Sequence, residues 1–328
     1  DTLTTAQKTF MDWAKRSDDK DARDLMERLP AGFFTLLDEI TIARSRKHIQ
    51  KYYRASMAQI GQFPQRQKPQ SVFSEIDSKG RFPSYDKLND EIGNYQLSLY
   101  KPSLYVKDEY KALYEKGNVR NFSQERREGF LIDMMKVNFL KRLESSVSSF
   151  GITMGRTVAK IERLEDKLQR FLQQQSAAAA DIQADLSLGP EEAEEDEDLA
   201  QAFEVGGKLK YQIAHLKVAE WLQALASDKQ QLAMLANSAK AVDVSSDAKL
   251  AELQKRIEHK VRHPHANNLG QPNRKIIVFC AFADTANYLY DALQAWVRQE
   301  LKVHVSLVSG GSRPNRSTFG QADFAQIL

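Results

Sequence analysis

The feature that most constrains the fold of this chain is a heptad repeat of apolar residues over residues 140–171. One position of the repeat holds Leu140, Val147, Met154, Ile161 and Leu168, and the other holds Leu143, Phe150, Thr157, Leu164 and Phe171. All but Thr157 are apolar, which is the pattern of a coiled-coil seam on one long helix. A helix with such a seam requires a partner helix to cover it.

The partner is expected in the same chain. After Gly207 the helical pattern of apolar residues returns and continues to Leu225. We therefore expect a helical hairpin over residues 123–240, because a nearby segment costs less entropy to pair than a second copy. Homodimerisation through the seam is the alternative. Residues 173–204 are rich in Gln, Ala and acidic residues and are expected to form a mobile loop.

Charge is unevenly distributed along the chain. The 328 residues contain 47 Lys and Arg against 44 Asp and Glu, but residues 181–200 hold nine acidic residues and no basic ones, so the rest is clearly basic. Residues 41–70 contain seven Lys and Arg and no Asp or Glu. This stretch favours contact with a polyanion. A solvated face with counter-charges elsewhere in the fold is the alternative.

The remaining segments give the domain organisation. Residues 1–60 are expected to form short helices, and residues 61–122 a Pro-containing and Gly-containing connector with a short strand at Val72 to Ile76 and further helices. In residues 245–328 a helix beginning near Asp247 precedes an apolar run from Ile276 to Phe282, which predicts a buried parallel strand.

A second strand is expected at Val303 to Val308, after an intervening helix, which completes a βαβ unit. The predicted fold class is therefore mainly α with a C-terminal α/β portion. In that portion the βαβ unit is only the opening of a domain, because two strands do not make a sheet that is covered on both faces.

Several segments resemble one family. Residues 275–293, KIIVFCAFADTANYLYDAL, resemble the first strand and helix of the second motor domain of superfamily-two helicases. Residues 247–253 resemble the helix before that strand in the Swi/Snf-like branch, and residues 36–49, 63–69 and 139–146 resemble further blocks of large bacterial helicases of that branch. The resemblance implies that residues 1–60 are the helical end of the first motor lobe. It further implies that a helical insertion follows and that residues 245–328 are the N-terminal part of a RecA-like second motor lobe.

The resemblance also implies an activity. Helicases of this type are ATP-dependent motors that separate strands or move along double-stranded DNA, with ATP and magnesium bound between two lobes. This chain contains no phosphate-binding loop, since Gly206-Gly-Lys-Leu209 lacks the first glycine and the final hydroxyl. No cofactor is therefore expected within it, and the chain alone is expected to be inactive. Asp38 and Glu39 follow apolar residues at helical spacing and are expected on a helix surface, not at a magnesium site.

Candidate nucleic-acid contacts come from three places. The basic run supplies Arg44, Arg46, Lys47 and Lys51. The turn after the predicted strand supplies Phe282, Asp284 and Thr285, and the end of the second strand supplies Ser309, Gly310 and Gly311. The alternative for Arg44 and Arg46 is a structural role between the lobes, and the alternative for the two turns is an ordinary helix cap and turn.

Other residue types limit the remaining functions. Cys280 is the single cysteine, which favours a reducing, cytoplasmic setting. No run approaches the about 18 apolar residues of a membrane span. His259, His263 and His265 cluster, but Pro264 interrupts the helix and no further ligand group is near, so we expect no metal site.

Two other functional classes stay open. A non-enzymatic scaffold could use the helical hairpin to bind a protein partner, and an accessory subunit could bind nucleic acid without a motor. Neither class accounts for the acid-free basic stretch together with the resemblance of residues 275–293, so the motor segment is the leading hypothesis.

Overall fold

The computed structural model describes residues 2–14, 22–41, 45–53, 63, 67–115, 124–174, 210–267, 270–310 and 315–320. The chain divides into two compact units, Asp1–Ser71 and Val72–Leu328.

The first unit consists of short helices. They are α1 (Thr2–Ala14), α2 (Ala22–Arg28), α3 (Ala31–Ile40) and α4 (Arg46–Tyr52). Within the described part of this unit only Ala6 is buried, while Phe10, Met11 and Ile40 are largely exposed. The predicted helices are present, but their apolar faces are not covered within the unit.

The second unit is mainly helical. Its N-terminal part contains α6 (Tyr85–Gly93), η1 (Ser98–Tyr100), η2 (Pro102–Tyr105), α7 (Asp108–Glu115), α8 (Gln124–Ser145), α9 (Val147–Gln174), η3 (Ile213–His215) and α13 (Val218–Lys240). Its C-terminal part contains α14 (Ala248–Arg262), β1 (His265–Ala266), β2 (Pro272–Asn273), α15 (Ala283–Glu300), β3 (Ser306–Leu307) and β4 (Arg316–Ser317).

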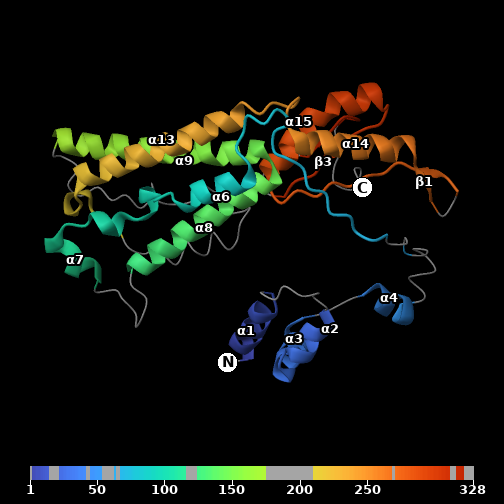
Figure 1. Ribbon diagram of the computed structural model, residues 1–328, viewed down its shortest axis with the longest axis horizontal. Coiled ribbons are helices and arrows are strands. Elements are labelled where there is room, and N and C mark those ends of the chain that lie inside the picture. Colours follow the sequence, from blue (N-terminus) through green and yellow to red (C-terminus); the bar gives the residue numbers. More distant parts are fainter. Residues whose placement is uncertain are drawn as a thin grey trace. The chain divides into compact units, whose positions relative to one another are not determined.

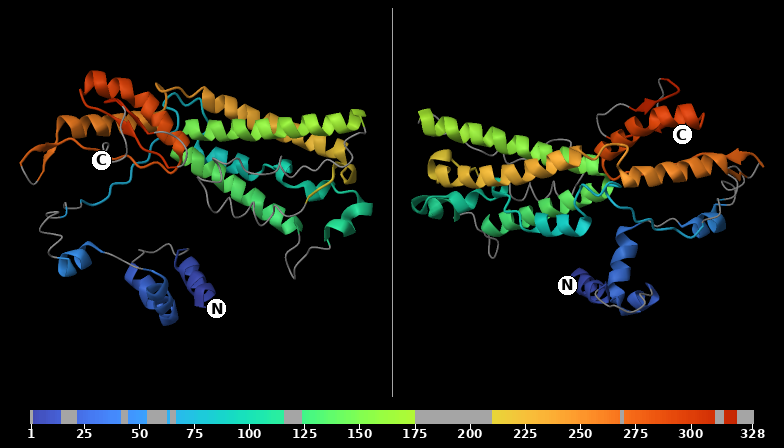
Figure 2. Two further views of the ribbon diagram at one scale, coloured as in Figure 1. Left: turned by 180° about the vertical axis from the view of Figure 1, so that it is seen from behind. Right: turned by 45° about the horizontal axis from the view of Figure 1, so that its top comes forward.

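Helices α9 and α13 form the predicted hairpin. They lie side by side along their length in all views (Figures 1 and 2). Gly151 of α9 lies opposite Ala239 of α13, and Glu165 forms an ion pair with Lys229, so the two helices run antiparallel. Most residues of the predicted seam are buried in this interface or beside it. The expected intrachain pairing is therefore confirmed. Helix α9 includes the first two residues of the predicted acidic loop at 173–204, and the remaining residues of that prediction lie outside the described residues.

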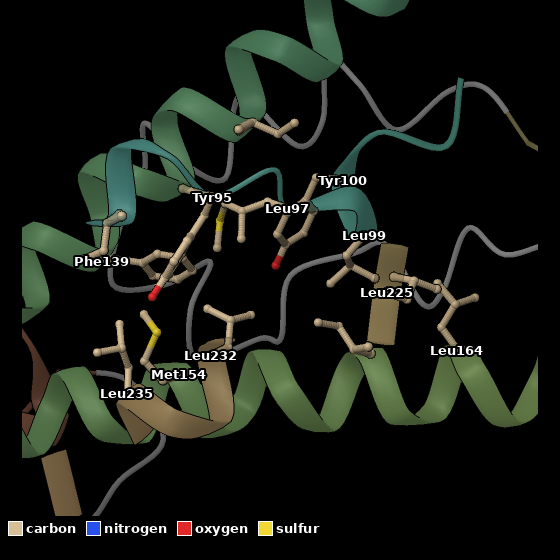
Figure 3. Packing of buried hydrophobic residues seen from close by; sticks show 14 of the residues in the cluster. Tyr95, Leu97, Leu99, Tyr100, Phe139, Met154, Leu164, Leu225, Leu232 and Leu235 are labelled. Atoms are coloured by element: carbon tan, nitrogen blue, oxygen red, sulfur yellow. The ribbon is translucent and has the colours of Figure 1, made fainter. Parts of the chain in front are cut away.

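A single core joins this hairpin to the segments before it. The core extends in sequence from Ile76 to Ala239 and includes the fully buried Trp221. Figure 3 shows Tyr95, Leu97, Leu99 and Tyr100 directed toward side chains of α9 and α13. Leu97 adopts a left-handed backbone conformation (φ 50°), and this turn places residues on both sides of it in the core.

The predicted long helix is interrupted at Ser146, which separates α8 from α9. The Ser146 hydroxyl accepts a hydrogen bond from the backbone N–H of Ser149 at 3.0 Å, which is the contact of an N-cap with the third residue of a helix. The heptad pattern does not show this break, because apolar residues on both sides of it stay in phase. We call the junction of α8 and α9 at Ser145 and Ser146 the elbow.

The predicted strands differ most from the structure. Residues 276–281 form no strand, and Ile276, Ile277, Val278 and Phe279 are 40%, 71%, 45% and 91% exposed. The second predicted strand is reduced to β3, which pairs antiparallel with β4. Residues 72–76 also form no strand. A strand needs the backbone of a neighbour, and within the described residues no neighbour pairs with 276–281. The prediction of a buried parallel strand was therefore wrong for this structure.

The length and hydropathy of each helix decide whether it could span a membrane. In the part of the chain that the structure describes, no helix is both long enough and apolar enough to cross a bilayer.

Candidate functional site

The basic run lies in the first unit and is only partly described. Lys47 and Lys51 lie one turn apart on α4, whereas Arg44 lies outside the described residues. The Arg46 guanidinium lies 5.3 Å from the centre of the Phe63 ring, and the Lys51 ammonium lies 5.0 Å from that of Tyr52. Aromatic rings thus accompany two of the predicted cations.

Asp38 and Glu39 belong to α3 and are exposed. This agrees with the expectation that they lie on a helix surface and do not follow a strand.

The second unit contains a buried ionic cluster centred on Asp284. Its carboxylate accepts hydrogen bonds from Arg142 of α8 at 3.3 Å and from Arg156 of α9 at 2.8 and 3.3 Å. The Arg142 side chain is completely buried, and its guanidinium lies 4.3 Å from the centre of the Phe282 ring. Asp284 therefore joins the first turn of α15 to the helices on both sides of the elbow.

Thr285 completes this junction. Its hydroxyl lies 2.7 Å from the Ser145 hydroxyl and 3.0 Å from the Ser146 hydroxyl. The side chains of Arg142, Arg156, Asp284, Thr285 and the elbow serines are called the elbow junction below. It holds α15 against the point where the helical body bends.

The elbow junction changes the interpretation of three predicted contacts. Phe282, Asp284 and Thr285 are only 4%, 5% and 3% exposed. In this structure these side chains hold α15 against the elbow and are not exposed, and their role as nucleic-acid contacts stays a prediction. Phe282, not Asp284, is the N-cap of α15, and Asp284 lies in its first turn, where the helix dipole favours a negative charge.

The start of α14 is fixed beside the elbow junction. The Asp247 carboxylate accepts a hydrogen bond from the Leu250 N–H at 2.8 Å, which caps α14, and another from the Tyr288 hydroxyl at 2.7 Å. Burial raises the pKa of Tyr288, and the hydrogen bond to Asp247 raises it further, so the phenol stays protonated as a donor. Helices α14 and α15 are thus tied to each other.

The loop before α6 reaches the same place. The Asp77 carboxylate accepts backbone N–H bonds from Lys79, Arg81 and Phe82 at 3.0, 2.8 and 3.2 Å. Burial alone raises the pKa of Asp77, but these donors outweigh it and hold the pKa below the ordinary value. Asp77 also forms an isolated bridge with Asp247, so three segments distant in sequence meet beside the elbow.

A half-open cavity of about 470 Å³ adjoins the elbow junction. Its walls come from the elbow, the first turns of α14 and α15, and residues 278–282. Apolar side chains such as Leu250, Leu253 and Phe282 dominate, with Lys141 and Glu144 among the polar lining. Cys280 also lines it, and burial raises the pKa of its thiol, which favours the unreactive protonated form.

The remaining predicted residues do not join this site. Ser309 and Gly310 follow β3, the Ser309 hydroxyl is buried, and Gly311 lies outside the described residues. The rings of His259, in the last turn of α14, and His263, the C-cap of this helix, are 4.8 Å apart, and both residues are exposed. Among the described residues no group of three or more His, Cys, Asp or Glu is arranged to hold a metal ion.

Sequence reasoning missed Arg156 and the role of Arg142. The available signal was that these two arginines lie two heptads apart and so share one side of the seam, with Ser149 between them. Arg142 is completely buried, which is unusual for a charged residue and indicates a buried partner of opposite charge.

Comparison with known proteins gives no family assignment: no family model matches the sequence, and neither curated proteins nor solved structures contain a match.

Proposed function

We propose that this chain is a segment of an ATP-dependent nucleic-acid motor, a helicase or translocase of the Swi/Snf-like branch that acts on double-stranded DNA in the cytoplasm. In this proposal the chain supplies nucleic-acid grip and mechanical coupling between lobes. ATP and magnesium are bound by parts of the motor that these residues do not include, so hydrolysis takes place outside this chain.

The observation that carries the proposal is the elbow junction. It joins residues 139–146 to residues 275–293, two blocks far apart in sequence that both carry the resemblance to the motor family. Asp284 and Thr285 of the second block bond directly to Arg142, Ser145 and Ser146 of the first. A helical body attached in this way to the first helix of the second lobe is suited to transmit the movement of that lobe.

The proposal also assigns a role to residues 276–281. Ile276 to Phe279 are exposed, Cys280 is half-buried, and within the described residues the backbone of 276–281 forms no hydrogen bonds. An inner strand of a RecA-like sheet needs neighbours on both edges and cover on both faces. We propose that this segment becomes such a strand when it pairs with other strands of the second lobe.

DNA binding by the chain tests the proposal. Fluorescence anisotropy with a labelled duplex should give an affinity that falls steeply between 50 and 200 mM salt, because phosphate contacts release counterions. The double variant Arg46→Gln/Lys51→Gln should bind more weakly. ATP turnover should be absent with or without DNA. Absence of duplex binding at low salt would refute the nucleic-acid role, and measurable turnover by pure protein would refute the assignment of hydrolysis to residues outside this chain.

A non-enzymatic scaffold is the second candidate. It is favoured by the absence of a multi-stranded sheet among the described residues, because a motor lobe is built on one. A scaffold predicts no salt-dependent affinity for the duplex, so the same binding experiment separates the two functions.

A further inference from the structure

A second acid-free basic stretch lies in the C-terminal part of the chain. Residues 259–283 contain four Lys and Arg, three His and no Asp or Glu. The stretch comprises the last turn of α14, the hairpin of β1 and β2, and the exposed apolar segment described above. It is far in sequence from the basic run at residues 41–70.

Hydrogen bonds among the described residues hold strands β1 and β2 together. His265 pairs with Asn273, and Ala266 pairs with Pro272, in an antiparallel register. The Asn267 side chain accepts the N–H of Gln271 at 2.9 Å, and the Asn273 side chain accepts the N–H of Lys275 at 3.0 Å. The backbone that carries the cations is therefore preorganised, which reduces the entropy lost on binding.

The cations of this hairpin are exposed and lack acidic partners. Arg274 and Lys275 are exposed. Within the described part of the chain, neither of them forms an ion pair, and Lys260 in the last turn of α14 forms none either. Arg262, by contrast, pairs with Glu258 at 2.7 Å. The helix dipole favours positive charge at the C-terminus of α14, which accounts for Lys260 and Arg262. Arg274 and Lys275 lie beyond the helix, so the dipole does not account for them.

We propose that the β1–β2 hairpin, with Arg274 and Lys275 as its contacts, is a second surface that binds the phosphodiester backbone of nucleic acid. Positive charge without intramolecular neutralisation is complementary to a polyanion. The inference rests on the proposed function, because it names a further contact surface for the same substrate. Through the hairpin the second unit contacts the nucleic acid, whereas Phe282, Asp284 and Thr285 are buried in this structure.

The salt dependence of duplex binding tests this assignment. In the full chain, Arg274→Gln/Lys275→Gln should lower the slope of log affinity against log salt concentration by about 2, since each phosphate contact contributes about 0.9. The matched control Lys87→Gln/Lys240→Gln removes the same charge from exposed positions on α6 and α13 and should leave the slope unchanged. Arg274→Lys/Lys275→Arg keeps the charge and should retain the slope.

The possible outcomes distinguish a failure of the hairpin surface from a failure of the proposed function. If wild type binds the duplex and the hairpin variant has the same slope and affinity, the hairpin surface is refuted while the proposed function stands. If wild type does not bind the duplex, both are refuted. Equal losses for the hairpin and control variants would indicate a net-charge effect and would overturn the hairpin as a surface. Binding of labelled polyglutamate that depends on Arg274 and Lys275, without an effect on DNA, would identify an acidic protein partner and also refute it.

Discussion

Asp284 lies between two guanidinium groups and is only 5% exposed. Arg142 has no exposed side-chain surface, and Arg156 is 30% exposed. Burying a charge is tolerable only when a partner of opposite sign and hydrogen bonds compensate for lost hydration. The carboxylate of Asp284 supplies a counter-charge for Arg142 and accepts one hydrogen bond from it, while the buried Arg142 Nε has no hydrogen-bond partner among the described residues.

Asp284→Asn should therefore be strongly destabilising. The substitution keeps the size of the side chain but removes the negative charge that Arg142 and Arg156 share, so we expect a loss of about 3–5 kcal/mol in unfolding free energy by urea titration. Asp291→Asn on the same helix breaks the exposed pair with Arg316 and should cost at most about 1 kcal/mol. Equal losses in the two variants would contradict a special role for the elbow junction.

Glu128 is a second buried carboxylate, in the helical body. It accepts hydrogen bonds from Tyr211 at 2.8 Å and from the Ser103 N–H at 3.1 Å. Burial nevertheless dominates over these donors and raises the pKa of Glu128 above its ordinary value of 4.5.

The pH dependence of stability should reveal this shift. Because the folded protein holds the proton of Glu128 more tightly than the unfolded chain, its contribution to the unfolding free energy falls as pH rises from about 4.5 through the raised pKa. The difference in unfolding free energy between wild type and Glu128→Gln should therefore decrease over that window and then become constant. A difference that is independent of pH, measured by urea titrations from pH 4.5 to 8, would show that the pKa is not raised.

At the scale of elements, the approach of α9 to α13 depends on Gly151. A Cβ atom built on Gly151 would lie 3.0 Å from the Ala239 Cβ, whereas one on Gly155 meets nothing within 4 Å. The two glycines are thus not equivalent, although both lower helix propensity in the same way.

Substitution of these glycines by leucine should have opposite effects. Gly151→Leu should destabilise the hairpin by about 1–3 kcal/mol through overpacking against α13. Gly155→Leu should be neutral or stabilise by up to about 1 kcal/mol through helix propensity. Thermal unfolding of the two variants measures this, and a stabilised Gly151→Leu protein would mean that the helices are not in close contact there.

The helical elements could be predicted well from sequence, and the strands could not. The pairing of α9 and α13 follows from a heptad pattern that both helices can satisfy with each other. The sequence analysis did not predict the break at Ser146, because the apolar residues before and after this capping serine keep the same heptad register. Of the candidate site, residues 139–146 and 275–293 were identified, but their direct contact was not, because it depends on how α15 packs against the elbow.

At the scale of the whole molecule, the exposed segment 276–281 determines how the chain behaves alone. An apolar segment with an unpaired backbone is prone to pair with another strand. In this structure its side chains contribute little to the folded core, although their sequence is that of a buried strand.

Phe279→Ser should accordingly change the unfolding free energy by less than about 0.5 kcal/mol, because the side chain is 91% exposed. Phe282→Ala, three residues later and buried under Arg142, should cost about 3–5 kcal/mol. The serine variant should also reduce self-association in sedimentation velocity runs. A loss of several kcal/mol for Phe279→Ser would mean that the segment is a buried strand even in the isolated chain.

The sequence by itself determined which segments of this protein are helical and that the seam of α9 needs a partner helix, because helical periodicity and a heptad seam are local properties. That the partner is α13 of the same chain was decided by the tertiary structure. Only the tertiary structure decided that Asp284 and Thr285 are buried at the elbow and that residues 276–281 stay unpaired. Both outcomes depend on groups distant in sequence: a carboxylate becomes a buried partner only where arginines meet it, and a strand exists only where another backbone accepts its hydrogen bonds.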